Sequence, residues 1–349
     1  MTKNNRALIA MSGGVDSSVA AHLAMELGFT CVGSTMILCQ SPEEAADARQ
    51  VADRLRIPFH IIDAAEPFRK LVQEEFVRCY EEGLTPNPCI TCNQTIKFGY
   101  LLERAKELGC DTVVTGHYAR IRKDESTGRS LLIKAADPQK DQSYFLSRLT
   151  QEQLSHSCFP LGELTKEQVR QKALELGLLN ARKKDSQDIC FVPDGDYMTF
   201  LENFTGRQYP GGDFLDLDGK VLGQHCGAVA YTLGQRKGLG LAMGAPVYVC
   251  GKDMSKNTVT VGPNEALFSR TLWADQFSWI PFCALTEPRQ VMAKARSRQA
   301  EQPAMVYPEA NGLIRVVFEE PQRAITPGQT VALYDGDVVL GGGRIIASE

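Results

Sequence analysis

The sequence predicts an α/β protein in which a parallel sheet covered by helices is followed by two β-rich units. Strand-like and helix-like segments alternate up to about residue 204, which is typical of a parallel sheet with helices on both faces. Beyond that point glycine and proline become frequent, and short apolar runs are separated by turn signals. We therefore expect an α/β domain over 1–204, a small β-rich domain over 205–269 and a β-barrel over 270–349.

The α/β part is predicted from the spacing of its apolar residues. Short apolar runs predict strands at Ala7–Met11, Thr30–Met36, Pro58–Asp63 and Thr112–Thr115. Helical spacing predicts helices at Ser17–Leu27, Pro42–Leu55, Pro67–Glu82, Gln94–Leu108, Glu163–Leu176 and Asp196–Phe204. Ligands of such sheets bind at the carboxyl ends of the strands, so a functional site is expected at that edge.

The rest of the chain is predicted to form short strands. The small domain has candidate strands at Ala228–Thr232, Pro246–Cys250 and Thr258–Val261. The barrel has candidate strands at Val291–Ala295, Leu313–Phe318, Thr330–Tyr334 and Val338–Leu340. Pairs such as Asn311-Gly312, Pro327-Gly328 and Asp335-Gly336 separate the barrel strands as turns.

The composition excludes several classes of protein. No apolar run of the 349 residues approaches the length of about 18 that a membrane helix needs, and the first run is too short for a signal peptide. We therefore expect a cytoplasmic protein with no membrane partner. Eleven cysteines in such a protein favour metal or thiol chemistry over a disulfide scaffold. A net charge of −4 gives no global signal for nucleic acid, but a local basic face would be sufficient.

The strongest chemical signal is the segment SGGVDSS at residues 12–18, between a predicted strand and a predicted helix. Unpaired backbone N–H groups and the helix dipole make such a turn an anion site, and Gly13 and Gly14 let a phosphate approach closely. Asp16 would repel phosphates unless a cation lies between them, which indicates Mg²⁺. The hydroxyl donors are Ser12, Ser17 and Ser18. The spacing fits neither a P-loop nor G-x-G-x-x-G, and it resembles the pyrophosphate loop of the ATP pyrophosphatases.

A second signal is Thr85–Asn93, with the letters TPNPCITCN. Its two prolines predict a stiff, non-helical loop that ends where the helix from Gln94 begins. Cys92 would then lie near a helix N-terminus, which would lower the pKa of its thiol. The pair Cys89-x-x-Cys92 alone is compatible with a zinc half-site, a redox pair, half of a cluster site or two incidental cysteines, and the chain has no second C-x-x-C.

A third signal is Lys183–Phe191, in which Cys190 follows a polar and partly basic segment. The remaining cysteines are isolated, and we expect them to fill space without a functional role. They are Cys31, Cys39, Cys79, Cys110, Cys158, Cys226, Cys250 and Cys283.

With these motifs the chain resembles the tRNA-specific 2-thiouridylases, which convert the wobble uridine of certain tRNAs to 2-thiouridine. The resemblance runs from end to end. Besides residues 12–18, it rests on Asn87-Pro88, Cys92-Asn93, 96–98 (IKF), 115–118 (TGHY), 140–146 (KDQSYFL), 184–191 (KDSQDICF), 232–240 (TLGQRKGLG), 326–329 (TPGQ) and 340–343 (LGGG).

The resemblance implies a Rossmann-like ATP pyrophosphatase domain and a two-step reaction. ATP would adenylate O2 of uridine 34, and sulfur from a persulfide on Cys190 would then replace that oxygen, giving 2-thiouridine, AMP and pyrophosphate. Cys92 would be the catalytic partner, and turnover would leave a Cys92–Cys190 disulfide to be reduced. The implied partners are tRNAs such as those for Lys, Glu and Gln, and a cysteine desulfurase or sulfur-relay protein as persulfide donor.

The resemblance also implies which residues bind. ATP contacts are expected at Met11, Ser12, Gly13, Gly14, Asp16, Ser17, Ser18, Met36 and Gly116. The target base is expected at Asn87, Pro88 and Cys89, and other tRNA contacts at His117, Lys140, Asp141, Gln142, Arg236, Lys237, Arg296, Ser297 and Gln329. Lys294, Arg296 and Arg298 alternate along a predicted strand and would share one face. Ser297 replaces an aromatic residue that is common in the family, so a stacking contact would be lost.

One departure leaves two mechanisms open. Cys89 stands where many family members have Asp, so the chain has three candidate thiolates: Cys89, Cys92 and Cys190. Three cysteines can hold a [4Fe–4S] cluster with one open iron that could carry the sulfur, as an alternative to the persulfide. The rival functions are another pyrophosphate-loop enzyme, such as a tRNA lysidine synthetase, and a non-catalytic RNA-binding or sulfur-carrier protein.

Overall fold

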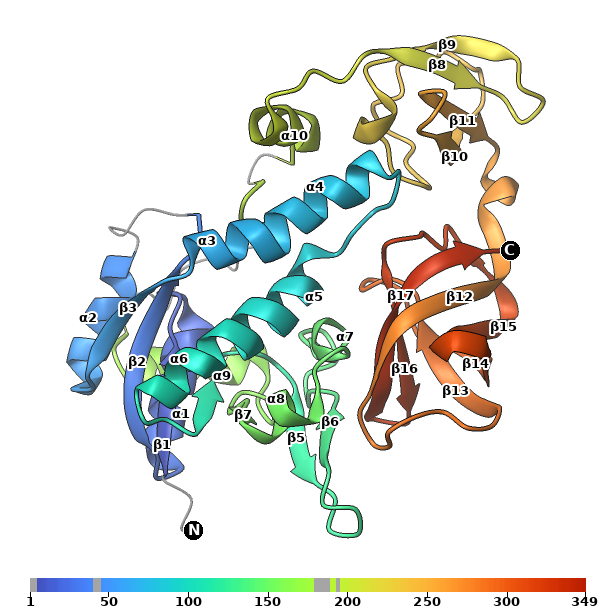
Figure 1. The fold of residues 1–349 in the computed structure, drawn as a ribbon. Coiled ribbons are helices and arrows are strands. Elements are labelled where there is room, and N and C mark those ends of the chain that lie inside the picture. Colours follow the sequence, from blue (N-terminus) through green and yellow to red (C-terminus); the bar gives the residue numbers. More distant parts are fainter. Residues whose placement is uncertain (1–4, 40–44, 179–188, 193–194) are drawn as a thin grey trace.

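A five-stranded parallel sheet forms the centre of the first part of the chain (Figure 1). The computed structural model describes residues 5–39, 45–178, 189–192 and 195–349. The strand order is β3-β2-β1-β4-β7, with every pair parallel. The strands are β1 (Arg6–Ala10), β2 (Thr30–Ile37), β3 (Phe59–Asp63), β4 (Thr112–Val114) and β7 (Ser157–Cys158). The predicted parallel sheet is therefore confirmed.

Two apolar cores cover the two faces of this sheet. Along β1, Leu8 packs with the helices that follow residue 88, whereas Ala7 and Ile9 pack with α1, α2 and α9. Successive side chains of a strand point to opposite faces, so a continuous apolar run is what a doubly covered strand requires. The strand order reverses at β1, so the loops that follow β1 and β4 flank the point where such sheets bind ligands.

The helices of this part lie close to the predicted positions. The α-helices are α1 (Val15–Glu26), α2 (Ala46–Leu55), α3 (Ala65–Phe68), α4 (Glu74–Glu81), α5 (Pro88–Cys92), α6 (Leu101–Glu107), α7 (Ser143–Leu146), α8 (Gln151–Ser155), α9 (Lys166–Glu175) and α10 (Tyr197–Thr205). Two π-helical stretches, η2 (Arg69–Gln73) and η3 (Asn93–Tyr100), join α3 to α4 and α5 to α6. The start of the helix predicted at Pro42–Leu55 lies outside the described residues.

Two predictions of secondary structure are wrong. The predicted loop Thr85–Asn93 extends only to Asn87, because the helix already begins at Pro88 and continues without a break through η3 into α6. Proline suits the first position of a helix, where its missing N–H would have no partner. The segment Ala228–Thr232 is not a strand, because it forms a short 3₁₀ turn, η4 (Ala228–Ala230). A short apolar run alone does not distinguish these two structures.

The last part of the chain is a closed antiparallel barrel of six strands. Its order is β12-β15-β14-β13-β16-β17, and pairing of β12 with β17 closes it. The strands are β12 (Phe268–Trp279), β13 (Arg289–Lys294), β14 (Gln302–Pro308), β15 (Ile314–Arg323), β16 (Thr330–Asp335) and β17 (Val338–Ser348), with two 3₁₀ turns, η5 (Asn264–Leu267) and η6 (Ala310–Gly312). A hairpin of the first part, β5 (Arg120–Lys123) and β6 (Ser130–Ile133), extends this sheet from β17.

The middle part is a small four-stranded sheet in the order β10-β11-β8-β9. Its strands are β8 (Gly212–Leu215), β9 (Val221–His225), β10 (Tyr248–Asp253) and β11 (Thr258–Gly262). Figure 1 shows this sheet beyond α10, above the barrel. Within the described residues, none of the helices combines the length and apolar character that a membrane span requires.

Candidate active site

The turn at residues 12–18 has the geometry of an anion site. Gly14 is the extended N-cap of α1 and donates no side-chain cap, so the first N–H groups of the helix face the turn. Gly13 has φ +70° and lies so close to α2 that a Cβ atom would be 2.8 Å from the Cβ of Asp47. The Ser17 and Ser18 hydroxyls both donate to the carbonyl of Gly14. The serines therefore hold the shape of the turn as well as offering oxygen atoms to a ligand.

A lysine that the sequence analysis did not identify neutralises Asp16. The Lys166 ammonium lies 2.7 Å and 2.8 Å from the two carboxylate oxygens of Asp16, and the Tyr118 hydroxyl donates to the same carboxylate at 2.9 Å. Lys166 is the first residue of α9 and is only 9% exposed. Lys166 thus supplies a positive charge beside Asp16 in addition to the Mg²⁺ that the sequence indicated. The Mg²⁺ ion at Asp16 stays a prediction.

The other residues expected at ATP surround this turn. Gly116 follows β4, and a Cβ there would lie 2.8 Å from the backbone carbon of Asp16 and 2.9 Å from the nitrogen of Ser17. Only glycine allows the two loops to approach so closely. Met11 is buried at the end of β1, where its N–H donates to Ser34 of β2. Met36 lies in β2 and is partly buried between two apolar cores.

The two cysteines of the C-x-x-C segment lie on α5, and Cys92 is not the activated thiol that its position predicted. Cys92 is 8% exposed, and burial raises the pKa of its thiol to about 11. The prediction of a lowered pKa is wrong, because the helix begins at Pro88, a full turn before Cys92, and burial desolvates the thiolate. Cys89 is at the surface, but the surrounding chain still desolvates its sulfur and raises its pKa.

Cys190 is the activated thiol of the site, and the thiol of Cys39 lies next to it. Cys39 follows the carboxyl end of β2, and its Sγ is 3.9 Å from the carbonyl oxygen of Cys190. A hydrogen bond from Cys39 lowers the pKa of Cys190 to about 7, although burial opposes this. The positive charge of Lys97 also lowers the pKa of Cys190. It has the same effect on the pKa values of Cys89 and Cys92, where burial outweighs it. The expectation that Cys39 only fills space is therefore not supported.

The three cysteines expected at an iron–sulfur cluster are not arranged as a metal site. Among the described residues, no group of three His, Cys, Asp or Glu side chains is close enough to hold a metal ion. Besides burial, the charge of neighbouring thiolates, including that of Cys190, raises the pKa values of Cys89 and Cys92. The three sulfur atoms are nevertheless not arranged as ligands of one metal ion. The described residues, as arranged, do not fit a [4Fe–4S] cluster. Residues 183–188 of the third motif lie outside the described residues.

Several residues predicted to contact tRNA are held by the chain itself. Asp141 accepts hydrogen bonds from the N–H groups of Ala135 and Ser143, and Gln142 accepts one from the N–H of Tyr118. Lys140 precedes them in the same turn and is half-buried. His117 is 9% exposed and hydrogen bonds to Thr115, and burial lowers its pKa well below the usual value. A direct RNA contact by His117 stays a prediction that this conformation does not support.

The motifs of the β-rich parts join the three parts of the molecule. The Gln329 amide donates to the carbonyls of Thr85 and Pro86, just before α5. Arg296 is half-buried and donates to the carbonyl of Leu233 and to the hydroxyl of Thr326. Arg296 and Ser297 lie in a bend, because β13 ends at Lys294. The prediction that Lys294, Arg296 and Arg298 alternate along one strand is therefore wrong.

Arg236 and Lys237 are the most accessible of the predicted RNA contacts. Both side chains are exposed in the loop between η4 and β10, close in sequence to the Leu233 carbonyl that Arg296 binds. Among the described residues, neither side chain forms an ion pair. They are free to meet a polyanion.

Family models match three segments of the chain. They are described as tRNA methyl transferase HUP domain over residues 5–194, tRNA methyl transferase PRC-barrel domain over 198–263, and aminomethyltransferase beta-barrel domain over 269–345. The first covers more than half of the chain. Their succession agrees with the α/β part, the small sheet and the barrel described above.

Full-length relatives are similar over almost the entire chain. Proteins named tRNA-specific 2-thiouridylase MnmA from Clostridioides difficile (strain 630) and Acetivibrio thermocellus are 45% and 46% identical, covering 99% and 97% of this chain and 99% of each relative. The protein of that name from Geotalea uraniireducens (strain Rf4) is 47% identical over 99% of this chain and 96% of its own length. At this identity and coverage, the chain belongs to the family of the tRNA-specific 2-thiouridylases.

Proposed function

We propose that this protein is an ATP-dependent tRNA-uridine 2-sulfurtransferase. It would adenylate O2 of wobble uridine 34 and then replace this oxygen with sulfur, releasing 2-thiouridine in tRNA, AMP and pyrophosphate. The observation that carries this proposal is the meeting of two sites at one edge of the sheet. The pyrophosphate loop follows β1, and the Cys39–Cys190 pair lies just beyond the neighbouring strand β2.

In the first step the loop at residues 12–18 would bind the departing pyrophosphate. Its backbone N–H groups and the dipole of α1 favour the negative charge that develops there. We propose that Lys166 acts together with Asp16, so that the carboxylate keeps the ammonium beside the phosphates. ATP would supply the adenylyl group, and Gly116 would leave room for the nucleotide next to α1.

In the second step the terminal sulfur of a Cys190 persulfide would attack C2 of the adenylated uridine. A carbon–sulfur bond forms, and AMP departs with the former O2. The Cys92 thiolate would then attack Sγ of Cys190, which forms a Cys92–Cys190 disulfide and releases the sulfur on C2. Cys92 must first lose its proton, and Lys97 is the cation that favours the resulting thiolate. A cysteine desulfurase or relay protein would reload Cys190 after an external thiol reduces the disulfide.

The RNA would lie against all three parts of the chain. We propose that Asn87, Pro88 and Cys89 meet the flipped target base, as enzymes that modify bases require, and that Arg236 and Lys237 bind backbone phosphates. The tRNA set would include Lys, Glu and Gln isoacceptors. We also propose that the protein acts in the cytoplasm, and that its domains span 1–204, 205–269 and 270–349. The activity of a Cys89→Ser variant tests whether the Cys89 thiol has a role in thiolation.

The proposed function is tested by measuring AMP and 2-thiouridine with an unmodified tRNA, ATP and a persulfide donor. The wild-type protein should form both products. Cys190→Ser should still form AMP with tRNA but no 2-thiouridine, because serine cannot carry a persulfide. Cys283→Ser is a matched control, since Cys283 is an exposed cysteine of the barrel part far along the chain from both sites. Failure of the wild-type protein to form AMP in the presence of tRNA would contradict the proposal.

A further inference from the structure

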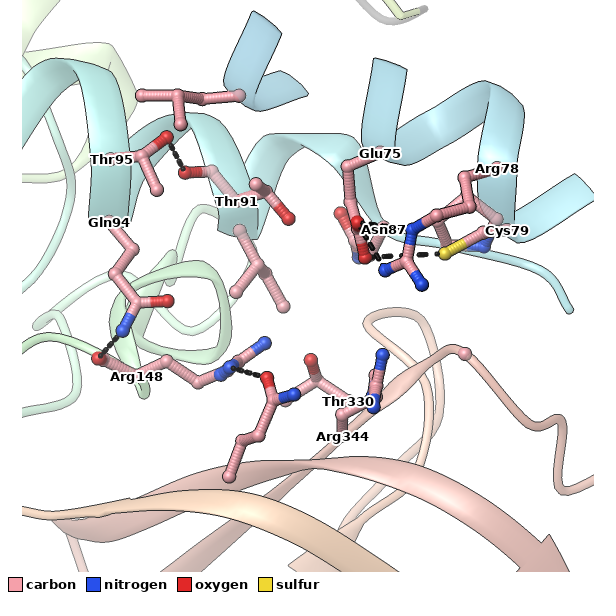
Figure 2. A pocket seen from close by; sticks show the side chains of 15 residues that line it. Glu75, Arg78, Cys79, Asn87, Thr91, Gln94, Thr95, Arg148, Thr330 and Arg344 are labelled. Atoms are coloured by element: carbon pink, nitrogen blue, oxygen red, sulfur yellow. Dashed lines mark hydrogen bonds and ion pairs between the residues drawn. The ribbon is translucent and has the colours of Figure 1, made fainter. Parts of the chain in front are cut away.

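A polar cavity lies between the α/β part and the barrel (Figure 2). Its volume is about 260 Å³, and its walls come from α4, α5 and η3 on one side and from β12, β16 and β17 on the other. Asn87, Thr91 and Gln94 face it along one side of the helix, as residues spaced by three and four do. Cys89 and Cys92 are spaced to lie on the opposite side, so this cavity is not the thiol site.

Three arginines line the cavity, and two of them have carboxylate partners. Arg344 donates to both oxygens of Asp275 in a bidentate pair. Arg78 is paired with Glu75 and Glu82. Because these carboxylates are already engaged, they do not make the cavity a cation site. The remaining arginine, Arg148, has no ion-pair partner among the residues that the structure describes.

Arg148 is a desolvated cation whose hydrogen-bonding capacity is only partly used. Its side chain donates to the amide oxygen of Gln276 at 3.1 Å, and its Nε is buried without a hydrogen-bond partner. Within the described part of the chain it makes no ion pair with a carboxylate. Burial and the nearby Arg344 lower the pKa of Arg148, and the carboxylates of Asp275 and Glu75 offset this lowering only in part. A desolvated guanidinium with no carboxylate in direct contact is costly, and an anion in the cavity would reduce that cost.

The backbone at Gln276 is held in an unusual conformation beside this arginine. Gln276 has φ +50° within β12, where the pairing with β17 shifts register between Asp275 and Ser278. A residue with a side chain adopts this region rarely and at a cost, and such positions concentrate at binding sites. Here the distortion brings the Gln276 amide to Arg148 and the Asp275 carboxylate to Arg344. The register shift therefore gives each guanidinium group a partner on β12, and Figure 2 shows Arg148 and Arg344 at the same cavity.

We infer that this cavity binds a phosphate group through the guanidinium of Arg148, with Arg344 beside it. A guanidinium offers a planar fork of donors that matches phosphate oxygens, and a dianion or phosphodiester would bring an anion into direct contact with the donors that Arg148 leaves unused. The group could belong to an RNA backbone or to free inorganic phosphate. The RNA backbone is favoured because Asn87, a proposed contact of the target base, borders the same cavity. This preference rests on the proposed function, whereas the phosphate site itself does not.

The test compares full-length wild-type protein with Arg148→Gln, Arg148→Lys and the control Arg54→Gln. Arg54 is an exposed arginine of α2, and among its described hydrogen bonds it donates only to the carbonyl of Leu176. Figure 1 shows α2 beside the edge of the parallel sheet that is farther from the barrel. One arm measures tRNA affinity between about 50 and 200 mM salt. The other arm titrates inorganic phosphate by calorimetry without RNA. Thermal melts confirm that each variant is folded, and Arg148→Lys keeps the charge if Arg148→Gln does not fold.

An RNA phosphate in the cavity should lower the slope of log affinity against log salt by about one unit in Arg148→Gln. Arg148→Lys should lie between it and the wild type, and Arg54→Gln should match the wild type. An unchanged slope with phosphate binding that is lost in Arg148→Gln would assign the site to free phosphate. The inference is overturned if neither arm depends on Arg148, or if Arg54→Gln changes as much. Thiolation by the wild-type protein is measured in parallel, so failure of the proposed function is seen separately.

Discussion

The ammonium of Lys166 and the carboxylate of Asp16 form an ion pair across 150 residues of sequence, with both oxygens within 2.8 Å. Asp16 lies in the first turn of α1 and Lys166 is the first residue of α9, so the two helix N-termini meet at this pair. The pair brings a positive charge to the turn that is proposed to bind pyrophosphate. It also explains how a carboxylate is tolerated there.

Breaking this pair should impair adenylation more than RNA binding. Lys166→Met would leave a partly buried carboxylate with only the Tyr118 hydroxyl, which costs about 3 kcal/mol of unfolding free energy. Asp16→Ala should abolish AMP formation and leave tRNA affinity nearly unchanged. AMP release and tRNA affinity, measured on the same preparations, check both variants. Wild-type turnover in Asp16→Ala would remove this loop from the mechanism.

The thiols should react with an alkylating agent in a set order. Because the pKa of Cys190 is about 7 and that of Cys92 about 11, iodoacetamide at pH 8 should label Cys190 and spare Cys92. Labelling of Cys190 should rise with pH with a midpoint near 7. Cys39→Ala should move this midpoint upward, since it removes the hydrogen bond that favours the thiolate. Peptide mass spectrometry gives the rates, and an unmoved midpoint would show that Cys39 does not activate Cys190.

The serine variants of the three candidate thiolates separate the two sulfur-transfer schemes. Cys92→Ser and Cys190→Ser should be inactive in thiolation under both schemes. Cys89→Ser should keep much of its activity and contain no iron if sulfur travels as a persulfide. Anaerobic purification, iron analysis and the rate of tRNA thiolation provide the measurement. Joint loss of iron and activity in a folded Cys89→Ser protein would contradict the persulfide scheme and favour the cluster.

The exposed cations of the middle part should contribute to RNA binding without affecting stability. Arg236→Ala with Lys237→Ala should lower the salt slope of tRNA binding by about two units, one for each lost phosphate contact. Arg296→Ala should instead lower the melting temperature, because its guanidinium joins Leu233 to Thr326. Salt-dependent binding and thermal melts distinguish these effects. A double variant with the wild-type slope would show that both cations are merely hydrated.

A methyl group at Gly116 should disturb the nucleotide site. Gly116→Ala would place a carbon 2.8 Å from the backbone of Asp16, so the loop after β4 must move away from α1. Such overpacking costs about 1–3 kcal/mol. ATP affinity should fall together with the melting temperature, and Gly251→Ala is the control, since a Cβ at Gly251 would meet no atom closer than the Cβ of Thr260 at 3.9 Å. A Gly116→Ala protein with wild-type ATP affinity would contradict the close approach of the two loops.

The sequence by itself determined the elements whose signals are local. The apolar run before residue 12, the glycines and the helical spacing after residue 15 lie within a few turns of one another, and they predicted β1, the anion turn and α1. The turn pairs and short apolar runs likewise indicated four of the barrel strands, whereas β12 and β14 were not predicted. The prediction at Pro88 was wrong because proline disrupts the interior of a helix but is favoured at its first position.

Only the tertiary structure decided which groups far apart in the sequence are in contact, and how their surroundings change their pKa values. Lys166 beside Asp16, Cys39 beside Cys190 and Gln276 beside Arg148 are each separated by more than 100 residues, and no local pattern pairs them. The pKa of Cys92 followed burial instead of its place near a helix start. The physical reason is that desolvation and Coulomb interactions depend on the atoms packed around a group, and packing brings together segments that are far apart in the sequence.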